Sequence, residues 1–99
     1  VGAVVGATYP REARVLRKIM SKSIFLVPGY GTQGGRAKDI IFNFNKDGRG
    51  ALINNARGII FAYKNEPYKS NFKPKEFHLA ARKAALEMKN DLLKTLKAL

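Results

Sequence analysis

The chain has 99 residues, enough for one domain at most, and a net charge of +12 from 19 basic and seven acidic residues. A hydrophobic content of 45% and a charged content of 26% are ordinary for a globular domain. The absence of cysteine excludes disulfides and thiolate metal sites, and it fits a cytoplasmic protein. No apolar run approaches the roughly 18 residues of a membrane span, so we expect no membrane partner.

The first predicted strand covers Val1–Ala7, which is rich in valine and small residues. Thr8 or Tyr9 is expected at the cap of the following helix, with Pro10 near its first position. The helix is predicted to end at about Met20. Its inward face is predicted to carry the apolar residues Ala13, Leu16, Ile19 and Met20.

The second predicted strand is Ile24–Val27, and it leads into a glycine-rich loop, Pro28–Gly35. A short helix is predicted to start near Arg36, and the segment Lys46–Gly50 breaks it. The inward residues of this helix are expected to be Ile40, Ile41 and Phe44.

The third predicted strand is Ala51–Asn55, and a short apolar segment, Ile59–Tyr63, follows soon after. A polar linker, Glu66–Pro74, precedes a last helix over about residues 75–99. The apolar face of that helix is expected to hold Phe77, Ala81, Ala84, Ala85, Met88, Leu92, Leu96 and Leu99.

Three strands that alternate with helices predict an α/β fold with parallel strands and right-handed crossovers. The strand runs are apolar rather than alternating, as expected for a parallel sheet covered by helices. Three parallel strands would leave two unpaired edges, so the chain is expected to be a fraction of a larger sheet.

The glycine-rich loop contains the pattern G-x-G-x-x-G between Gly29 and Gly34, which is typical of dinucleotide sites. Such a site also needs an acidic residue about 20 positions later, at the end of the next strand. That strand ends in Asn54 and Asn55, which disfavours a dinucleotide. The glycines, the Gln33 amide and the N–H groups of a helix start favour a general phosphate site. A plain tight turn is the alternative.

Arg57 follows the third strand, and its planar fork of donors suits a phosphate monoester. Neighbouring parallel strands end at the same rim, so Arg57 is expected beside the Gln33 loop. Its place between two apolar segments, where a stray arginine would be costly, favours function over a surface salt bridge. Two consecutive loops that converge on phosphate also occur after strands seven and eight of many (β/α)8 barrels. His78 is expected to be solvated or to cap the last helix, without a functional role. For Tyr9, Tyr30 and Tyr63 two interpretations stay open, namely rim residues or packing residues.

Three motifs in this order and spacing resemble the C-terminal part of orotidine 5′-phosphate decarboxylase, in its bacterial subgroup: VVGATYPREARVLRKI, FLVPGYGTQGG and ALINNARGIIFAY. The resemblance covers nearly the whole chain. It implies that residues 1–99 are the C-terminal part of a single TIM-barrel domain, with strands six to eight. It further implies conversion of orotidine 5′-phosphate to uridine 5′-phosphate and CO2 in pyrimidine biosynthesis, by a homodimer without metal or cofactor.

By this resemblance, the Gln33 side-chain amide and the Arg57 guanidinium hold the substrate phosphate. Backbone N–H groups near Ala56 and Arg57 complete the phosphate site, and Pro28 lines the pyrimidine pocket. Many members of the family carry glycine or serine at the position of Ala56, a small departure that leaves a backbone contact intact.

The family's catalytic lysine and aspartates form an Asp-x-Lys-x-x-Asp motif on earlier strands, and the chain has no such motif. Asp39, Asp47 and Asp91 lack the spacing. A (β/α)8 barrel needs about 250 residues, so this chain supplies less than half of one. We therefore expect it to be inactive alone and to need the missing N-terminal barrel portion as its partner.

Two alternatives stay open at this point. The first is a basic nucleic-acid-binding module, which the net charge invites. The basic residues are dispersed, without a block of five or six like charges, so we favour solvated helix faces and no nucleic-acid partner. The second is a non-catalytic phosphate-binding subunit that complements a separate chain.

Overall fold

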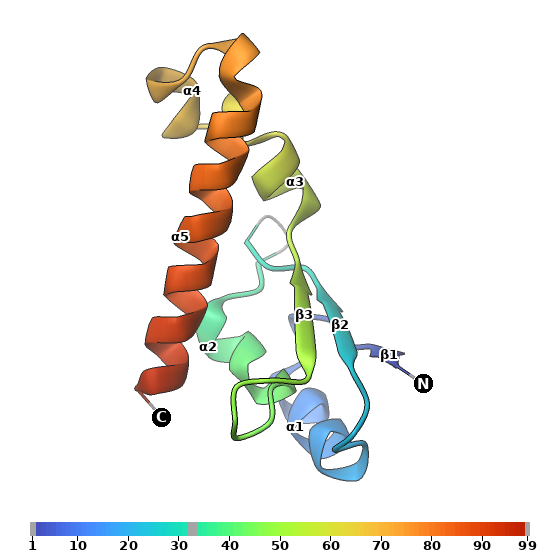
Figure 1. Cartoon of the computed structure of the whole chain (residues 1–99). Coiled ribbons are helices and arrows are strands. Elements are labelled where there is room, and N and C mark those ends of the chain that lie inside the picture. The colour runs from blue at the N-terminus through green and yellow to red at the C-terminus, as the bar shows by residue number, and fades with distance from the viewer. Residues whose placement is uncertain (1, 32–33, 99) are drawn as a thin grey trace.

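A computed structural model describes residues 2–31 and 34–98, which form a three-stranded parallel sheet with helices (Figure 1). The strands are β1 (Ala3–Val4), β2 (Phe25–Pro28) and β3 (Ala51–Asn54), and they lie side by side in chain order. The pairing of β1 with β2 and of β2 with β3 is parallel. The predicted α/β class is thus confirmed, and the arrangement is consistent with part of a (β/α)8 barrel.

The first strand is shorter than its predicted run, but its pairing continues beyond β1. The N–H of Val5 donates to the carbonyl of Leu26 at 2.9 Å, and the N–H of Ala7 donates to the carbonyl of Pro28 at 2.8 Å. The chain after β1 therefore follows β2 to the end of that strand.

The helix α1 (Pro10–Ile19) connects β1 with β2, and its proline lies at the start as predicted. The second crossover contains α2 (Ala37–Ile40) and the 3-10 helix η1 (Ile41–Asn43). Among the described residues, no helix is both long and apolar enough to cross a membrane.

The third crossover is longer and more irregular than the other two. After β3 come α3 (Ala56–Ile60) and the 3-10 helix η2 (Ala62–Lys64). The predicted polar linker contains two short helices, α4 (Tyr68–Asn71) and the 3-10 helix η3 (Pro74–Glu76). The last helix, α5 (Phe77–Lys97), then returns along the sheet.

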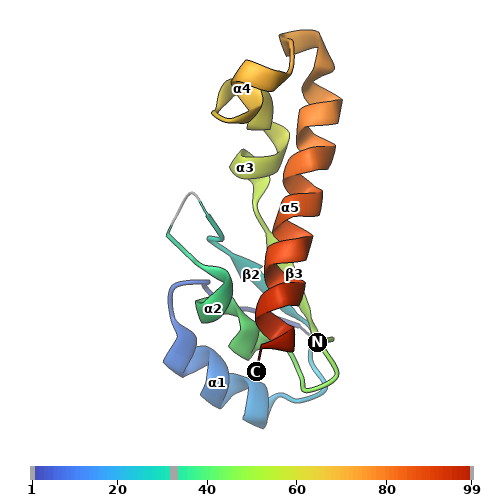
Figure 2. The same cartoon turned by 90° about the vertical axis from the view of Figure 1, so that its left-hand side faces the viewer.

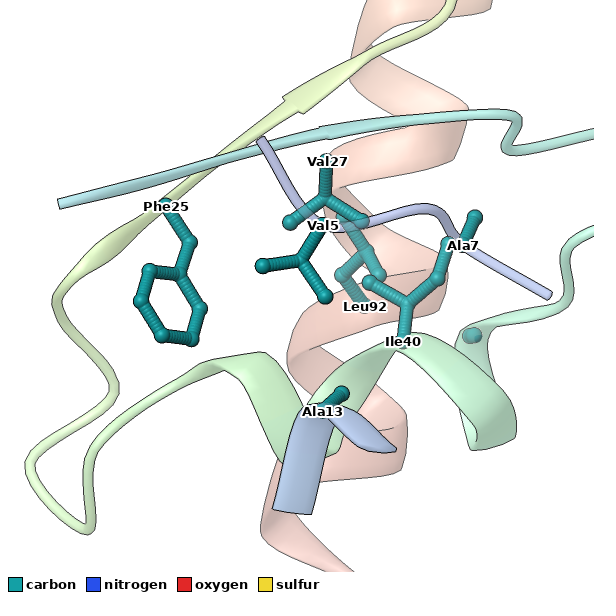
Figure 3. Packing of buried hydrophobic residues seen from close by; sticks show 8 residues of the cluster. Val5, Ala7, Ala13, Phe25, Val27, Ile40 and Leu92 are labelled. Atoms are coloured by element: carbon teal, nitrogen blue, oxygen red, sulfur yellow. The ribbon is translucent and has the colours of Figure 1, made fainter. Parts of the chain in front are cut away.

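Figures 1 and 2 show α1, α2 and α5 on one side of the sheet. On that side Phe25 and Val27 of β2 are fully buried. They point toward buried residues of the helices, and the labelled members of this core are Val5, Ala7, Ala13, Phe25, Val27, Ile40 and Leu92 (Figure 3). A second, smaller core lies under α4 and consists of Ala62, Ala80 and Ala84.

The opposite face of the sheet carries an open apolar row of Val4, Leu26 and Leu52, which are direct partners in the register. Their side chains are 71%, 42% and 62% exposed. Strands of parallel sheets are normally buried on both faces, which explains why these strands are apolar throughout. The second face lacks its cover in the part of the chain that the structure describes.

Two predicted inward residues lie outward instead. Ile19 is 74% exposed, because the inward face of α1 is formed by residues at the spacing i, i+3, i+4 and i+7 that starts at Ala13. Arg17 takes the third of these positions. Phe77 is 54% exposed, because it begins α5 beyond the sheet, where its ring meets the edge of Tyr63. Ala80 is the buried residue of that turn.

Arg17 is 6% exposed, so the prediction that basic residues lie on solvated helix faces is wrong for it. Its Nη1 donates to the carbonyls of Asn43 at 2.9 Å and Gly50 at 3.0 Å. Its Nη2 donates to the carbonyls of Met20 and Ser23. These carbonyls belong to the segments that lead into β2 and β3, so one guanidinium joins the chain at the amino ends of both strands.

Candidate functional site

The carboxyl end of β2 leads into a compact turn, which we call the glycine loop and define as residues 29–31 and 34–35. Gly29, Gly31 and Gly34 have φ of 105°, 75° and 90°, a region that side chains disfavour. The N–H of Gly35 donates to the carbonyl of Gly29 at 2.9 Å, and the N–H of Gly31 donates to the carbonyl of Gly35 at 2.8 Å. The loop therefore has a defined backbone in its described part.

Gly35 is required for a different reason, namely close packing. A Cβ at this position would lie 2.6 Å from the Cβ of Ala7 and 2.6 Å from the carbonyl oxygen of Gly29. The glycine loop is thus packed against the segment that follows β1, and both reach the same rim of the sheet.

The carboxyl end of β3 leads into α3, whose first turn is organised by Asn55. The Oδ1 atom of Asn55 accepts a hydrogen bond from the N–H of Gly58 at 3.2 Å. Ala56 and Arg57 are the first two residues of the helix, and both are exposed. Their N–H groups belong to the first turn, where backbone donors have no acceptor inside the helix.

The two loops meet at the rim, as the sequence predicts for consecutive parallel strands. A Cβ placed on Gly31 would lie 3.7 Å from Nδ2 of Asn55, which is ordinary contact distance. Arg57 lies two residues beyond Asn55 in the sequence. Gln33 lies outside the described residues, so its predicted contact with phosphate stays a prediction.

Arg57 is exposed and forms no ion pair within residues 2–31 and 34–98. The argument that a stray arginine would be costly at this position is therefore wrong, because the side chain is not buried between the apolar segments. The alternative of a surface salt bridge is not observed in the described chain either. The guanidinium is left with donors that a ligand can use.

Pro28 is the last residue of β2 and pairs with Asn54 of β3. Because side chains alternate between the two faces of a strand, Pro28 shares the open face with Leu26. It lies at the rim, next to the glycine loop, where the predicted pyrimidine pocket would be. No contact in the structure tests that role.

Tyr30, which received no role from the sequence, connects the glycine loop with α5. Its ring packs against the main core, and its hydroxyl donates to Oδ2 of Asp91 at 2.6 Å. Burial, and then the hydrogen bond to Asp91, raise the pKa of Tyr30 well above the ordinary tyrosine value. Sixty-one positions separate the two residues, so no local spacing could reveal the contact.

Tyr9, Tyr63 and His78, which also received no role from the sequence, either are exposed or contact residues of their own region. Tyr9 precedes α1 and is 59% exposed. The rings of Tyr63 and His78 each meet the ring of Phe77 in an edge-to-face arrangement. None of the three reaches the glycine loop in the contacts that the structure describes.

Two further acidic residues have structural partners close to them in the sequence. Asp39 pairs with Nε of Arg36 at 3.4 Å, and Asp47 accepts the N–H of Arg49 at 3.0 Å in a turn. Residues 2–31 and 34–98 contain no cluster of three or more histidine, cysteine or acidic side chains that could hold a metal. The described rim thus offers hydrogen-bond donors and several cations, because Arg36 and Lys38 lie beside the glycine loop in addition to Arg57 after β3.

Several curated proteins are similar to this chain in sequence. The orotidine 5′-phosphate decarboxylases of Rhodopirellula baltica and Petrotoga mobilis are 45% and 47% identical to it over 93% of the chain. That of Clostridium tetani is 38% identical over 97% of the chain. The chain is homologous to the C-terminal part of orotidine 5′-phosphate decarboxylases. It spans about 30% of the length of these relatives.

The homology confirms the resemblance that the three sequence motifs indicated. No family model matches the chain. The regions matched in the Rhodopirellula and Clostridium tetani proteins cover 92 and 96 residues of this chain. The glycine loop and the start of α3 are therefore part of one homologous segment.

Proposed function

We propose that this chain is the part of an orotidine 5′-phosphate decarboxylase that binds the phosphate of the substrate. In this proposal β1, β2 and β3 are strands six, seven and eight of a TIM barrel. The observation that supports it is the approach of Asn55 to Gly31, where an added Cβ would meet the Asn55 side chain at van der Waals distance, so two consecutive loops lie together at one rim. In many (β/α)8 barrels the phosphate site is built from the last two loops.

The phosphate would be held by donors of three kinds. The Arg57 guanidinium presents a planar fork that can make two parallel bonds to a dianionic phosphate. The N–H groups of Ala56 and Arg57 add backbone donors at the first turn of α3. The amide of Gln33 is the third donor, on the basis of the family resemblance. Asn55 shapes this turn, because its side chain holds the N–H of Gly58.

The phosphate is remote from the carbon that loses CO2, so its binding does not take part in bond breaking. Binding energy from a remote group can nevertheless orient the reacting group and offset the cost of removing it from water. The chain thus contributes to the rate through substrate position. By the family resemblance, the chemical step would belong to the Asp-x-Lys-x-x-Asp motif, which these 99 residues do not contain.

The open apolar row supports the incomplete-barrel part of the proposal. Val4, Leu26 and Leu52 would face the barrel interior, where side chains of neighbouring strands pack in layers. The remaining N-terminal portion would cover them. A cytoplasmic homodimer is expected for the complete enzyme from the family resemblance.

The test is Arg57→Ala in the complete decarboxylase that carries this segment. Removing a hydrogen-bond partner of a charged group, here the phosphate, costs about 1.5–3 kcal/mol, which weakens the affinity about tenfold to one hundredfold. Binding of uridine 5′-phosphate should weaken by this amount, while binding of uridine should stay unchanged. Arg57→Lys should recover only part of the loss, because an ammonium lacks the planar fork.

Arg49→Ala is the matched control, since it removes the same charge from an exposed residue before β3, at the opposite end of that strand. It should leave both affinities unchanged. Equal weakening of uridine 5′-phosphate and uridine by Arg57→Ala would show that Arg57 is structural and that the phosphate assignment is wrong.

A further inference from the structure

The hydrogen bond between Tyr30 and Asp91 is a long-range contact of the glycine loop to a helix. Tyr30 lies between two glycines of positive φ, Gly29 and Gly31, which bond to Gly35 within the loop but, among the described residues, not to any helix. Its hydroxyl donates to Asp91 on α5 at 2.6 Å. The same helix is fixed to the main core one residue later by the buried Leu92.

Neighbouring residues of the loop point to different partners. Tyr30 reaches α5, on the covered side of the sheet, whereas Gly31 faces the side chain of Asn55 at the start of α3, which an added Cβ at Gly31 would touch. A tyrosine fixed on one side therefore determines where the next residue meets the proposed phosphate site. Tyr30 also pairs with Gly35 as an isolated bridge, so the contact to α5 acts on both ends of the loop.

We propose that Tyr30 and Asp91 are positioning residues, which fix the glycine loop against α5 and thereby set its geometry for the substrate phosphate. This inference rests on the proposed function. Neither residue touches the ligand in this arrangement. Asp91 acts through Tyr30, and Tyr30 acts through the backbone of the glycine loop.

The chemistry of the contact suits such a role. A phenol that donates to a carboxylate makes a short, charge-assisted bond. The raised pKa of Tyr30 keeps the hydroxyl protonated well above neutral pH, so the donor is present under all ordinary conditions. The carboxylate lies on a helix of 21 residues, which is a rigid support.

The experiment compares Tyr30→Phe with Tyr68→Phe in the complete decarboxylase. Tyr68 is a matched control, because its hydroxyl also donates to a carboxylate of α5, Glu87, but belongs to α4 and the smaller core. Tyr30→Phe should weaken binding of uridine 5′-phosphate about tenfold and leave uridine unchanged. Tyr68→Phe should change neither affinity.

Two further measurements separate positioning from a general loss of structure. Amide hydrogen exchange of Gly31, Gly34 and Gly35 should accelerate in Tyr30→Phe and not in Tyr68→Phe. Asp91→Ala should have the same effect on nucleotide binding as Tyr30→Phe, and the double variant should show no additional loss. A simple sum of the two single losses would mean that the residues act separately, which overturns the inference.

Arg57→Ala, measured in parallel, separates this inference from the proposed function. If Arg57→Ala weakens the nucleotide but Tyr30→Phe behaves like Tyr68→Phe, the phosphate site stands and the positioning role is wrong. If glycine-loop exchange accelerates without any change in nucleotide affinity, the contact holds the loop but does not position it for phosphate, and the inference is again overturned.

Discussion

Two arginines at opposite ends of the sheet show how one side chain serves different purposes. Arg17 lies at the amino ends of β2 and β3, buried, with four carbonyl oxygens as acceptors. Arg57 follows the carboxyl end of β3, exposed, with no ion pair in the described chain. Donors that the protein already uses stabilise the fold, whereas unused donors are available to a ligand. The same division between a stability end and a functional end is general in (β/α)8 barrels.

Arg17→Ala should have the largest effect on stability. It removes the donors for four carbonyls, and it also removes the cation that lies 4.0 Å over the ring centre of the fully buried Phe25. We expect a loss of about 3 kcal/mol or more in the free energy of unfolding, measured by urea denaturation of the complete enzyme. Arg11→Ala, at an exposed position of the same helix, is the control and should stay within about 0.5 kcal/mol.

An unchanged urea midpoint in Arg17→Ala would show that the buried Arg17 does not stabilise the fold and would contradict its contrast with Arg57. Arg17→Lys sharpens the test, because a lysine keeps the charge but cannot reach four carbonyls with the same fork. It should lie between the wild type and Arg17→Ala.

Gly58→Ala tests whether the functional end also carries a structural requirement. A Cβ on Gly58 would lie 2.4 Å from Nδ2 of Asn55, so the capping side chain would have to move. We expect a loss of about 1 kcal/mol, the usual value of a helix cap, together with weaker nucleotide binding. Arg11→Ala, the exposed control used for Arg17, serves here as well and should change neither stability nor nucleotide binding.

Arg57→Ala should leave stability unchanged within about 0.5 kcal/mol, although it weakens nucleotide binding. The reason is that Arg57 is exposed and the described chain gives it no ion pair to lose. Urea denaturation without ligand measures this directly. A destabilisation similar to that of Arg17→Ala would mean that both arginines are structural.

The smallest effect concerns the two tyrosines that donate to carboxylates of α5. Burial, and then the hydrogen bond to Glu87, raise the pKa of Tyr68 to about 12, and the pKa of Tyr30 is raised in the same direction. Because the folded pKa is the higher one, both bonds are intact below the ordinary tyrosine pKa of about 10 and are lost as pH rises through the folded values. In a pH titration followed by tyrosinate absorbance, Tyr68→Phe and Tyr30→Phe should each lose one tyrosine that ionises above the ordinary tyrosine pKa.

Titration of these tyrosines should accordingly leave stability unchanged between about pH 6 and about pH 9, because that range lies below the ordinary tyrosine pKa of about 10. A tyrosinate signal that appears fully near about pH 10 in the folded enzyme, with no late component, would contradict the assigned hydrogen bonds.

Local patterns in the sequence were sufficient for the order of the elements. The apolar runs predict the three strands, Pro10 predicts the start of α1, and the glycines predict the tight loop, because each depends on neighbouring residues. The meeting of the loops at Gly31 and Asn55 followed from parallel pairing. The proposal that the three strands are strands six to eight of a (β/α)8 barrel came from the family resemblance.

What could not be predicted depends on contacts between distant segments. Arg17 carries the charge of a surface residue, and its burial is understandable only once four carbonyls from separate segments surround it. The Tyr30–Asp91 bond joins residues with no periodic relation. The short helix α4 forms within a polar segment whose composition predicts only a linker, and packing of Tyr68 against the smaller core stabilises it.

The open apolar row has a consequence for biosynthesis. Relatives carry this segment at their C-terminus, and domains emerge from the ribosome from the N-terminus onward. In such a protein Val4, Leu26 and Leu52 would be synthesised when the part that covers them already exists, so their exposure would be brief. Any rearrangement of the gene that places this segment first would leave the same three side chains uncovered for longer, during the period when a nascent chain is most prone to aggregate.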